Sequence, residues 1–143
     1  MFARYVLLAV TFFCLHGIWE TMHVHLYTAY DALGAGVPLL LWATSGDVLY
    51  SLLCVLVVAV FFRDFRWPAH PRLSHLAAAS LCGFWVAVII EWKALIFHKW
   101  AYTAAMPMIP LLHVGLSPVL QMSLAVPLCV LGSVYVYKQF RNV

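Results

Sequence analysis

Residues 39–62 read LLLWATSGDVLYSLLCVLVVAVFF, and Asp47 is the sole charged side chain among them. A transmembrane helix needs about 20 consecutive, mostly apolar residues, so this stretch predicts a membrane span. Three other stretches share this character: 5–27, 74–97 and 118–137. We therefore expect an all-α polytopic membrane protein in which residues 1–143 form one transmembrane domain, a four-helix bundle.

The composition excludes several classes of soluble protein. Of the 143 residues, 66% are hydrophobic and 9% are charged, whereas soluble domains carry about 25% charged residues. A soluble fold of this size could not bury so much apolar surface. A soluble enzyme, a disordered chain and a nucleic-acid-binding module are excluded, so we expect no nucleic-acid partner. The four cysteines lie in apolar runs without a C-x-x-C pair, which disfavours a redox or thiolate metal site.

The basic residues predict how the bundle is oriented. Those that flank the spans on one side of the membrane are Arg4, Arg63, Arg66, Arg72, Lys138 and Arg141. The loop between the first two spans has no Lys or Arg, and the loop between the last two has only Lys99. Because basic loops stay in the cytoplasm, we expect both termini to be cytoplasmic.

Some aromatic and histidine residues are expected at the edges of the membrane. Tryptophan is enriched at membrane–water interfaces, and Trp67 lies near the inner edge of the expected bundle. We likewise expect His25, His70 and His75 to be interfacial.

Polar side chains inside the spans are informative, because ionisable groups within a membrane are costly and usually functional. In the first span they recur at i, i+4, i+7 and i+11, on one helix face: His16, Glu20, His23 and Tyr27. Alternatively, these residues could have only a structural role and form hydrogen bonds that hold neighbouring helices together.

The other three spans carry polar residues at a similar depth. Asp47 lies in the outer half of the second span, Glu91 near the outer end of the third, and Gln121 one turn into the fourth. The inner halves are almost entirely Leu, Val, Ala and Phe. We expect a polar pocket that opens toward the outer side and is closed below by an apolar plug. As alternatives, Asp47 could pair with a histidine or with Lys93 and only hold the bundle together, and Glu91 could be solvated.

The segment 100–115 reads WAYTAAMPMIPLLHVG and contains one histidine but no Asp, Glu, Lys or Arg. An exposed apolar loop of this length would be a liability, so we expect a re-entrant-like segment that dips into the membrane interface and covers the pocket. Pro107 and Pro110 would stiffen it. Trp100 and Tyr102 would then line the pocket.

Short motifs follow one another along almost the whole chain. They are Trp19-Glu20 with Leu26-Tyr27, Gly46-Asp47, Glu91, Trp100-x-Tyr102, Met106-Pro107, Pro110, Gly115-Leu116, Pro118 and Leu120-Gln121. With this pattern the chain resembles a family of small, functionally uncharacterised bacterial four-helix inner-membrane proteins. The resemblance implies a multi-pass protein of the bacterial inner membrane, and it brings no activity with it.

Two more distant likenesses concern membrane lipid enzymes. The His16-x-x-x-Glu20 spacing, with a second membrane glutamate and a tryptophan, resembles the sterol-isomerase-like (EXPERA) bundles. The Trp100-x-Tyr102 motif after a membrane carboxylate resembles small lycopene-cyclase domains. Both likenesses imply an acid and a cation-stabilising aromatic wall inside a small helical bundle.

The first functional hypothesis is a protein that binds or transforms a membrane lipid or isoprenoid by acid–base chemistry. A desolvated carboxyl group can hold a proton and deliver it to a double bond. Glu20 beside His16 is the candidate acid, and Asp47 and Glu91 complete the candidate catalytic set. The candidate substrate-binding residues are Trp100, Tyr102, Tyr27 and Gln121. This hypothesis requires no cofactor.

Two alternatives belong to other functional classes. Histidines and carboxylates at helical spacing can bind a divalent metal such as zinc, iron or copper. The candidate ligands are His16, Glu20, His23, His98 and His113. The other alternative is a non-catalytic accessory subunit, whose pocket would pack against a partner in a membrane complex or against a second copy of the chain.

Overall fold

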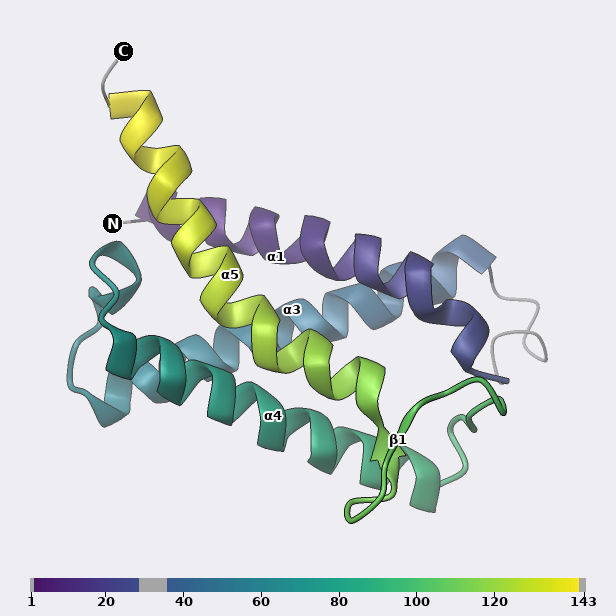
Figure 1. Ribbon diagram of the computed structural model, residues 1–143. Helices are drawn as coiled ribbons and strands as arrows, with labels where there is room; N and C mark the ends of the chain where they lie inside the picture. Colours follow the sequence, from purple (N-terminus) through teal and green to yellow (C-terminus); the bar gives the residue numbers. More distant parts are fainter. Residues whose placement is uncertain (1, 29–35, 142–143) are drawn as a thin grey trace.

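A computed structural model of the chain describes residues 2–28 and 36–141. The four long helices are α1 (Phe2–His23), α3 (Gly36–Phe61), α4 (Leu73–Ile96) and α5 (Leu116–Arg141). Each contains a segment long and apolar enough to cross a membrane, which confirms the expected all-α bundle of four membrane helices (Figure 1). α3 and α5 extend a few residues beyond the expected spans, because hydropathy detects only the apolar part of a helix. α1, in contrast, ends at His23, and Tyr27 follows a 3-10 turn in extended conformation, so its predicted place on the helical face was wrong.

The helices run side by side and form a closed bundle. α5 packs against both α4 and α1, and α3 packs against α1 and α4. The start of α1, the last turns of α5 and the loop 62–72 lie at one end, which we call the terminus end (Figure 1). The segment 97–115 lies at the other end, which we call the hairpin end.

A single glycine sets the closest approach of α4 and α5. A Cβ atom built on Gly83 would lie 2.1 Å from the carbonyl oxygen of Met122. Any side chain at this position would therefore push the two helix backbones apart. Small residues permit such close helix packing in membranes, where no hydrophobic driving force holds apolar helices together.

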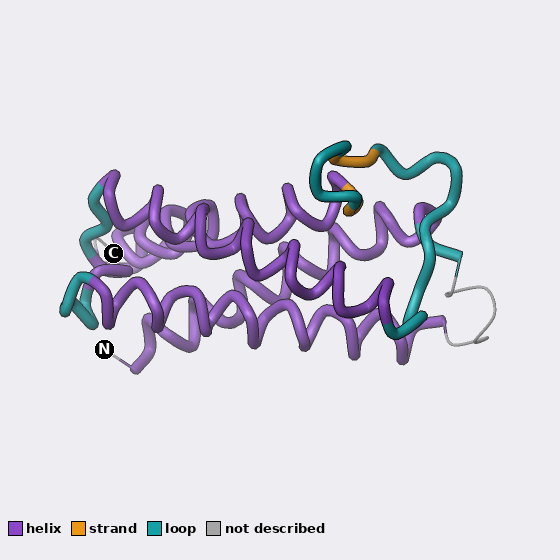
Figure 2. Tube along the Cα trace, turned by 90° about the horizontal axis from the view of Figure 1, so that it is seen from below, coloured by secondary structure: helices purple, strands orange, loops and turns teal. Residues whose placement is uncertain are grey.

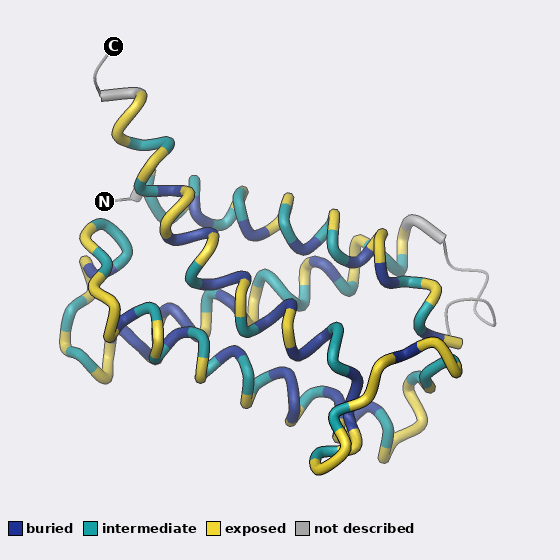
Figure 3. Tube along the Cα trace, viewed as in Figure 1, coloured by how far each residue is buried: buried dark blue, intermediate teal, exposed yellow. Residues whose placement is uncertain are grey.

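The half of the bundle toward the terminus end has an apolar core. Its buried residues include Leu8, Phe12, Cys54, Val58 and Val126. Buried positions follow the inward faces of the helices (Figure 3). This core corresponds to the apolar plug expected below the polar residues.

Two residues expected at the membrane interface belong to this core. Trp67, in the 3-10 turn η2 (Trp67–Ala69), is fully buried and donates a hydrogen bond from Nε1 to the Val55 carbonyl oxygen at 3.1 Å. His75 is also buried, with its ring 5.6 Å from that of Trp67 and 4.6 Å from that of Phe62. Both side chains are therefore enclosed by protein, because the loop 62–72 folds back and inserts Trp67 between the helix ends. Their depth in the membrane stays a prediction.

The segment between α4 and α5 forms a short hairpin over the end of the bundle (Figure 2). Strands β1 (Met108–Ile109) and β2 (Val114–Gly115) pair antiparallel, with Met108 opposite Gly115. The segment is also tied to the turn η1 (Val24–Leu26) that follows α1, because Thr103 N donates to Leu26 O at 2.9 Å. The hairpin therefore covers this end of the bundle, while its insertion into a membrane interface stays a prediction.

Candidate functional site

Gln121 connects three helices near the hairpin end. Its side chain is buried, and Nε2 lies 3.0 Å from His16 Nδ1, 3.2 Å from Glu20 Oε1 and 2.9 Å from Asp47 Oδ2. An amide NH₂ group has two hydrogens, so it is shared among these three acceptors. One residue of α5 thereby holds the polar side chains of α1 and α3 in place.

His16 supports this junction from behind. The residue is completely buried, and its Nε2 lies 2.8 Å from Ser51 Oγ. Because Nδ1 accepts a hydrogen bond from Gln121, Nε2 carries the hydrogen and donates it to Ser51. His16 is not among the residues that line the neighbouring cavity. His16 therefore orients the side-chain amide of Gln121 without facing the cavity.

Glu20 also lies at the end of a hydrogen-bonded chain that begins at Trp19. Trp19 Nε1 donates to Ser117 Oγ at 3.3 Å, and Ser117 Oγ lies 2.8 Å from His23 Nδ1. His23 Nε2 lies 3.1 Å from Glu20 Oε1. An indole N–H can only donate, so Trp19 donates to Ser117, and Ser117 and His23 continue the hydrogen-bonded chain to the Glu20 carboxyl group.

Glu20 and Asp47 also approach each other. Gln121 Nε2 contacts an oxygen of each, Glu20 Oε1 at 3.2 Å and Asp47 Oδ2 at 2.9 Å, so the two carboxyl groups lie close together across the α1–α3 interface. Two carboxylates held this close repel each other unless one of them carries a proton. Of the two, Asp47 is the more accessible, with 23% of its side chain exposed against 7% for Glu20.

A second polar group surrounds Glu91 on α4. Its Oε2 accepts a hydrogen bond from Trp100 Nε1 at 3.2 Å and one from the Tyr102 hydroxyl. The Tyr102 hydroxyl in turn accepts a hydrogen bond from Gly115 N at 3.0 Å. Burial, together with the nearby Glu91 carboxyl group, raises the pKa of Tyr102 above its usual range, so this phenol remains a donor at neutral pH.

Tyr27 closes the gap between the two polar groups. Its ring centroid lies 5.4 Å from that of His23, 5.6 Å from that of Tyr102 and 6.1 Å from that of Trp100. Tyr27 also forms an isolated β-bridge with Tyr102, so the residue after η1 and the loop after α4 are joined through backbone and side chains alike. The result is an aromatic wall beside the carboxyl groups.

A cavity of about 420 Å³, which we call the carboxyl cavity, lies among these groups. Three carboxyl residues from three helices line it: Glu20, Asp47 and Glu91. Its wall also contains Gln121, His23, Tyr27 and Trp100. The remaining wall is largely apolar and comes mainly from α3 and α4, with Leu39, Trp42, Ala87, Ile90, Phe97 and Met122. Lys93 and Lys99 add positive charge to the lining.

The structure thus brings most of the expected lipid-site residues together. Six of the eight line the carboxyl cavity: Glu20, Asp47, Glu91, Tyr27, Trp100 and Gln121. The other two, His16 and Tyr102, hydrogen-bond to residues of that wall. From the sequence, Ser51 shares the helical face of Asp47 and Ser117 is a candidate cap of the fourth span, but neither was given a partner. In the structure they complete the hydrogen bonds of His16 and His23.

The five residues of the metal alternative are not brought into one group. His16, Glu20 and His23 share the network around Gln121, whereas His98 and His113 are exposed loop residues that do not line the carboxyl cavity. Both loop histidines have positive φ values, 50° and 55°, which fit turns. Within residues 2–28 and 36–141, no three His, Cys, Asp or Glu side chains are placed to hold a metal ion.

Comparisons of the chain with protein-family models, with curated proteins and with solved structures gave no match.

Proposed function

We propose that the protein binds an amphiphilic lipid- or isoprenoid-like molecule in the carboxyl cavity and moves protons on it by acid–base chemistry. The observation that carries this proposal is the mixed character of the cavity wall. Three carboxyl residues, Glu20, Asp47 and Glu91, line the same cavity as a larger number of apolar and aromatic side chains, most of them from α3 and α4. Such a wall suits a molecule with a small polar or reactive end and a hydrocarbon body.

The Glu20–Asp47 pair is the proposed proton donor. The two carboxyl groups share the Gln121 amide as a hydrogen-bond donor, and His23 Nε2 lies 3.1 Å from Glu20 Oε1. Because these contacts hold the carboxyl groups in one orientation, little rearrangement is needed when the proton leaves. Asp47, as the more exposed member, presents the proton to the ligand.

Isomerisation of a double bond illustrates the chemistry. The π electrons form a new C–H bond with the proton of the Glu20–Asp47 pair and leave a positive charge on the second carbon. Glu91 then removes a proton from a neighbouring carbon, and that C–H electron pair forms the new double bond. One proton enters and one leaves, so no oxidant or cofactor is consumed. Tyr27 and Trp100 offer aromatic faces that stabilise the cation.

Deuterium incorporation tests this proposal without knowledge of the substrate. Purified protein in mild detergent is incubated with a bacterial total lipid extract in D₂O, and the lipids are analysed by mass spectrometry. We expect a lipid that gains one deuteron from the solvent only when wild-type protein is present. The variant Asp47→Asn should abolish this gain while it keeps its helical circular dichroism and melting temperature close to wild type.

Asp64→Asn is the matched control, because Asp64 lies in the loop 62–72 at the other end of the bundle and does not line the carboxyl cavity. It should incorporate deuterium as the wild type does. Unchanged incorporation by folded Asp47→Asn protein, or none by the wild type, would contradict the proposed chemistry.

A further inference from the structure

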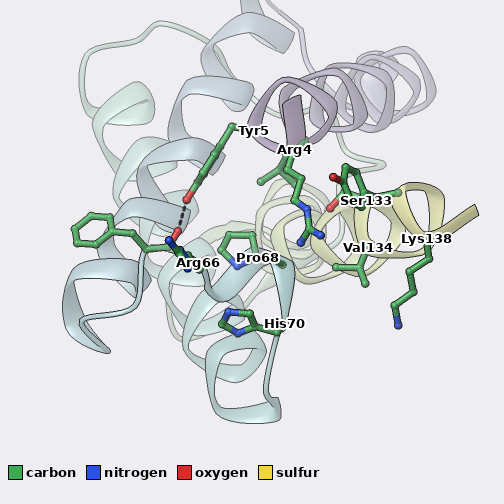
Figure 4. Close-up of a pocket in the computed structure, with 12 residues that line it drawn as sticks. Arg4, Tyr5, Arg66, Pro68, His70, Ser133, Val134 and Lys138 are labelled. Atoms are coloured by element: carbon green, nitrogen blue, oxygen red, sulfur yellow. Dashed lines mark hydrogen bonds between the residues drawn. The ribbon is translucent and has the colours of Figure 1, made fainter. Parts of the chain in front are cut away.

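A second cavity, of about 480 Å³, lies at the terminus end of the bundle. It is bounded by the first turns of α1, the loop 62–72 and the C-terminal part of α5 (Figure 4). Four basic side chains from these three segments line it: Arg4, Arg66, His70 and Lys138. No Asp or Glu of the described residues is part of its wall. We call it the basic cavity.

Specific contacts hold the walls of the basic cavity in place. The Tyr5 hydroxyl donates to Phe65 O at 2.6 Å, which ties the loop to α1. The Arg4 guanidinium lies over the Tyr137 ring, 4.1 Å from its centroid, and so joins α1 to α5. In Figure 4 this guanidinium points from α1 into the space between α5 and Pro68. The cavity is therefore built by contacts between segments distant in the sequence.

The charge of this region is not balanced by acids. Asp64 is the one carboxylate of the loop, and its Oδ1 accepts a hydrogen bond from Arg66 N at 2.8 Å. Its Oδ2 lies 3.8 Å from His70 Nδ1. The side chains of Arg4, Arg66 and Lys138 form no salt bridge in the described part of the chain. Several positive charges around one cavity repel each other, and an anion bound among them would offset this repulsion.

A general excess of basic residues on one membrane side does not by itself produce this arrangement. Arg63 and Arg72 belong to the same loop, yet neither lines the basic cavity. The fold directs Arg66 and His70 from that loop toward the same space as Arg4 and Lys138. Arg66, which lines the basic cavity, and Arg63, which does not, therefore form a test and control pair of equal charge.

We propose that the basic cavity binds a phosphate group, carried either by the headgroup of an anionic phospholipid or by a soluble phosphate ester. Guanidinium groups match the geometry of phosphate oxygens, and a lysine adds a point charge. The cavity lies at the end of the membrane helices, at the depth where phospholipid headgroups are found. This site is separate from the carboxyl cavity and does not depend on the function proposed for it.

The test uses the full chain, purified in neutral detergent and freed of lipid. Native mass spectrometry follows its titration with phosphatidylglycerol, phosphatidylcholine or inorganic phosphate. We expect phosphatidylglycerol to bind at least about tenfold more tightly than phosphatidylcholine, and inorganic phosphate to compete with it. Arg66→Gln and Lys138→Gln should each weaken phosphatidylglycerol binding by about fivefold, the contribution of one basic residue near a membrane surface.

Arg63→Gln is the matched control and should bind phosphatidylglycerol within about twofold of wild type, since a remote charge acts only through the screened field. Arg66 and Lys138 are both exposed, so their variants should fold, and melting temperatures verify this. Phosphate binding that gains nothing from the lipid chains would assign the site to a soluble phosphate ester. An equal loss of phosphatidylglycerol affinity in Arg63→Gln would overturn the proposal. Binding of phosphatidylglycerol no tighter than that of phosphatidylcholine, together with no binding of inorganic phosphate, would also overturn it.

Discussion

Replacement of Gln121 by leucine tests the polar junction that organises the carboxyl cavity. The amide of Gln121 is shared among His16, Glu20 and Asp47, at 2.9 to 3.2 Å. Leucine has a similar volume and keeps the helix propensity of α5, but it removes both amide hydrogens. No buried side-chain nitrogen or oxygen of the described residues lacks a hydrogen-bond partner, so the variant creates unpaired groups in a fully satisfied network.

The size of the effect follows from the number of bonds. An amide NH₂ group makes two hydrogen bonds at a time, and interhelical hydrogen bonds in membrane proteins contribute about 0.6 to 1.7 kcal/mol each. Gln121→Leu should therefore lower the free energy of unfolding by about 1 to 3 kcal/mol. Reversible unfolding in mixed micelles, followed by circular dichroism, measures this quantity.

The control for this prediction is Gln139→Leu in the same helix. Gln139 is exposed near the end of α5, and its replacement should change the free energy of unfolding by less than about 0.5 kcal/mol. If Gln121→Leu were no more destabilising than Gln139→Leu, the junction would not hold α1, α3 and α5 together, and the geometry of the carboxyl cavity would need another explanation.

Two further variants test the packing of α5 and the cover of the cavity. Gly83→Leu should destabilise the bundle by more than about 2 kcal/mol, because its Cβ would meet the Met122 carbonyl oxygen at 2.1 Å. The control is Gly132→Ala, which should be neutral or slightly stabilising because nothing lies within 4 Å of the added atom. Equal effects of the two variants on stability would contradict the assigned helix contact. Tyr102 has a pKa raised by burial, so its contribution to stability should be complete below about pH 10, the pKa of an unfolded tyrosine, and should be lost as the pH rises through the folded-state value. Chemical unfolding between neutral and strongly alkaline pH should show a shallower loss for Tyr102→Phe than for wild type, and identical slopes would refute the buried donor.

The membrane helices could be predicted from the sequence because their signal is local. Twenty or so apolar residues identify a span whatever its neighbours are, and residue 47 interrupts the run 39–62 without ending it. The depth of Glu20, Asp47 and Gln121 followed from counting along each span. Their meeting at one cavity was expected from depth alone, since helices of equal length in one bilayer align their ends.

The contacts between the helices could not be predicted in the same way. Rotation of each helix about its axis decides that Gln121 is the residue that contacts α1 and α3, while His16 lies behind it. This rotation depends on packing features such as Gly83, which hydropathy does not register. A pattern of polar residues at one depth therefore indicates a site without assigning roles within it.

Loop conformation could not be predicted from the sequence either. Trp67 and His75 were expected at the membrane interface, and the fold-back of the loop 62–72 encloses both side chains in protein. His98 and His113 were plausible ligands by residue type, and their turns keep them exposed. In both cases the outcome depends on contacts that the local sequence does not specify.

Native mass spectrometry shows directly whether the carboxyl cavity holds an amphiphilic molecule. The mass of the protein in mild detergent is compared before and after denaturation, for the wild type and for Gly46→Trp. Gly46 lines the cavity on α3, and a Cβ atom added there has nothing within 4 Å, so the new side chain can occupy the cavity. We predict that the wild type releases a molecule with the mass of a single lipid or isoprenoid and that folded Gly46→Trp protein does not. Equal release by both proteins, or no release by wild-type protein even after incubation with the total lipid extract, would contradict binding in the carboxyl cavity.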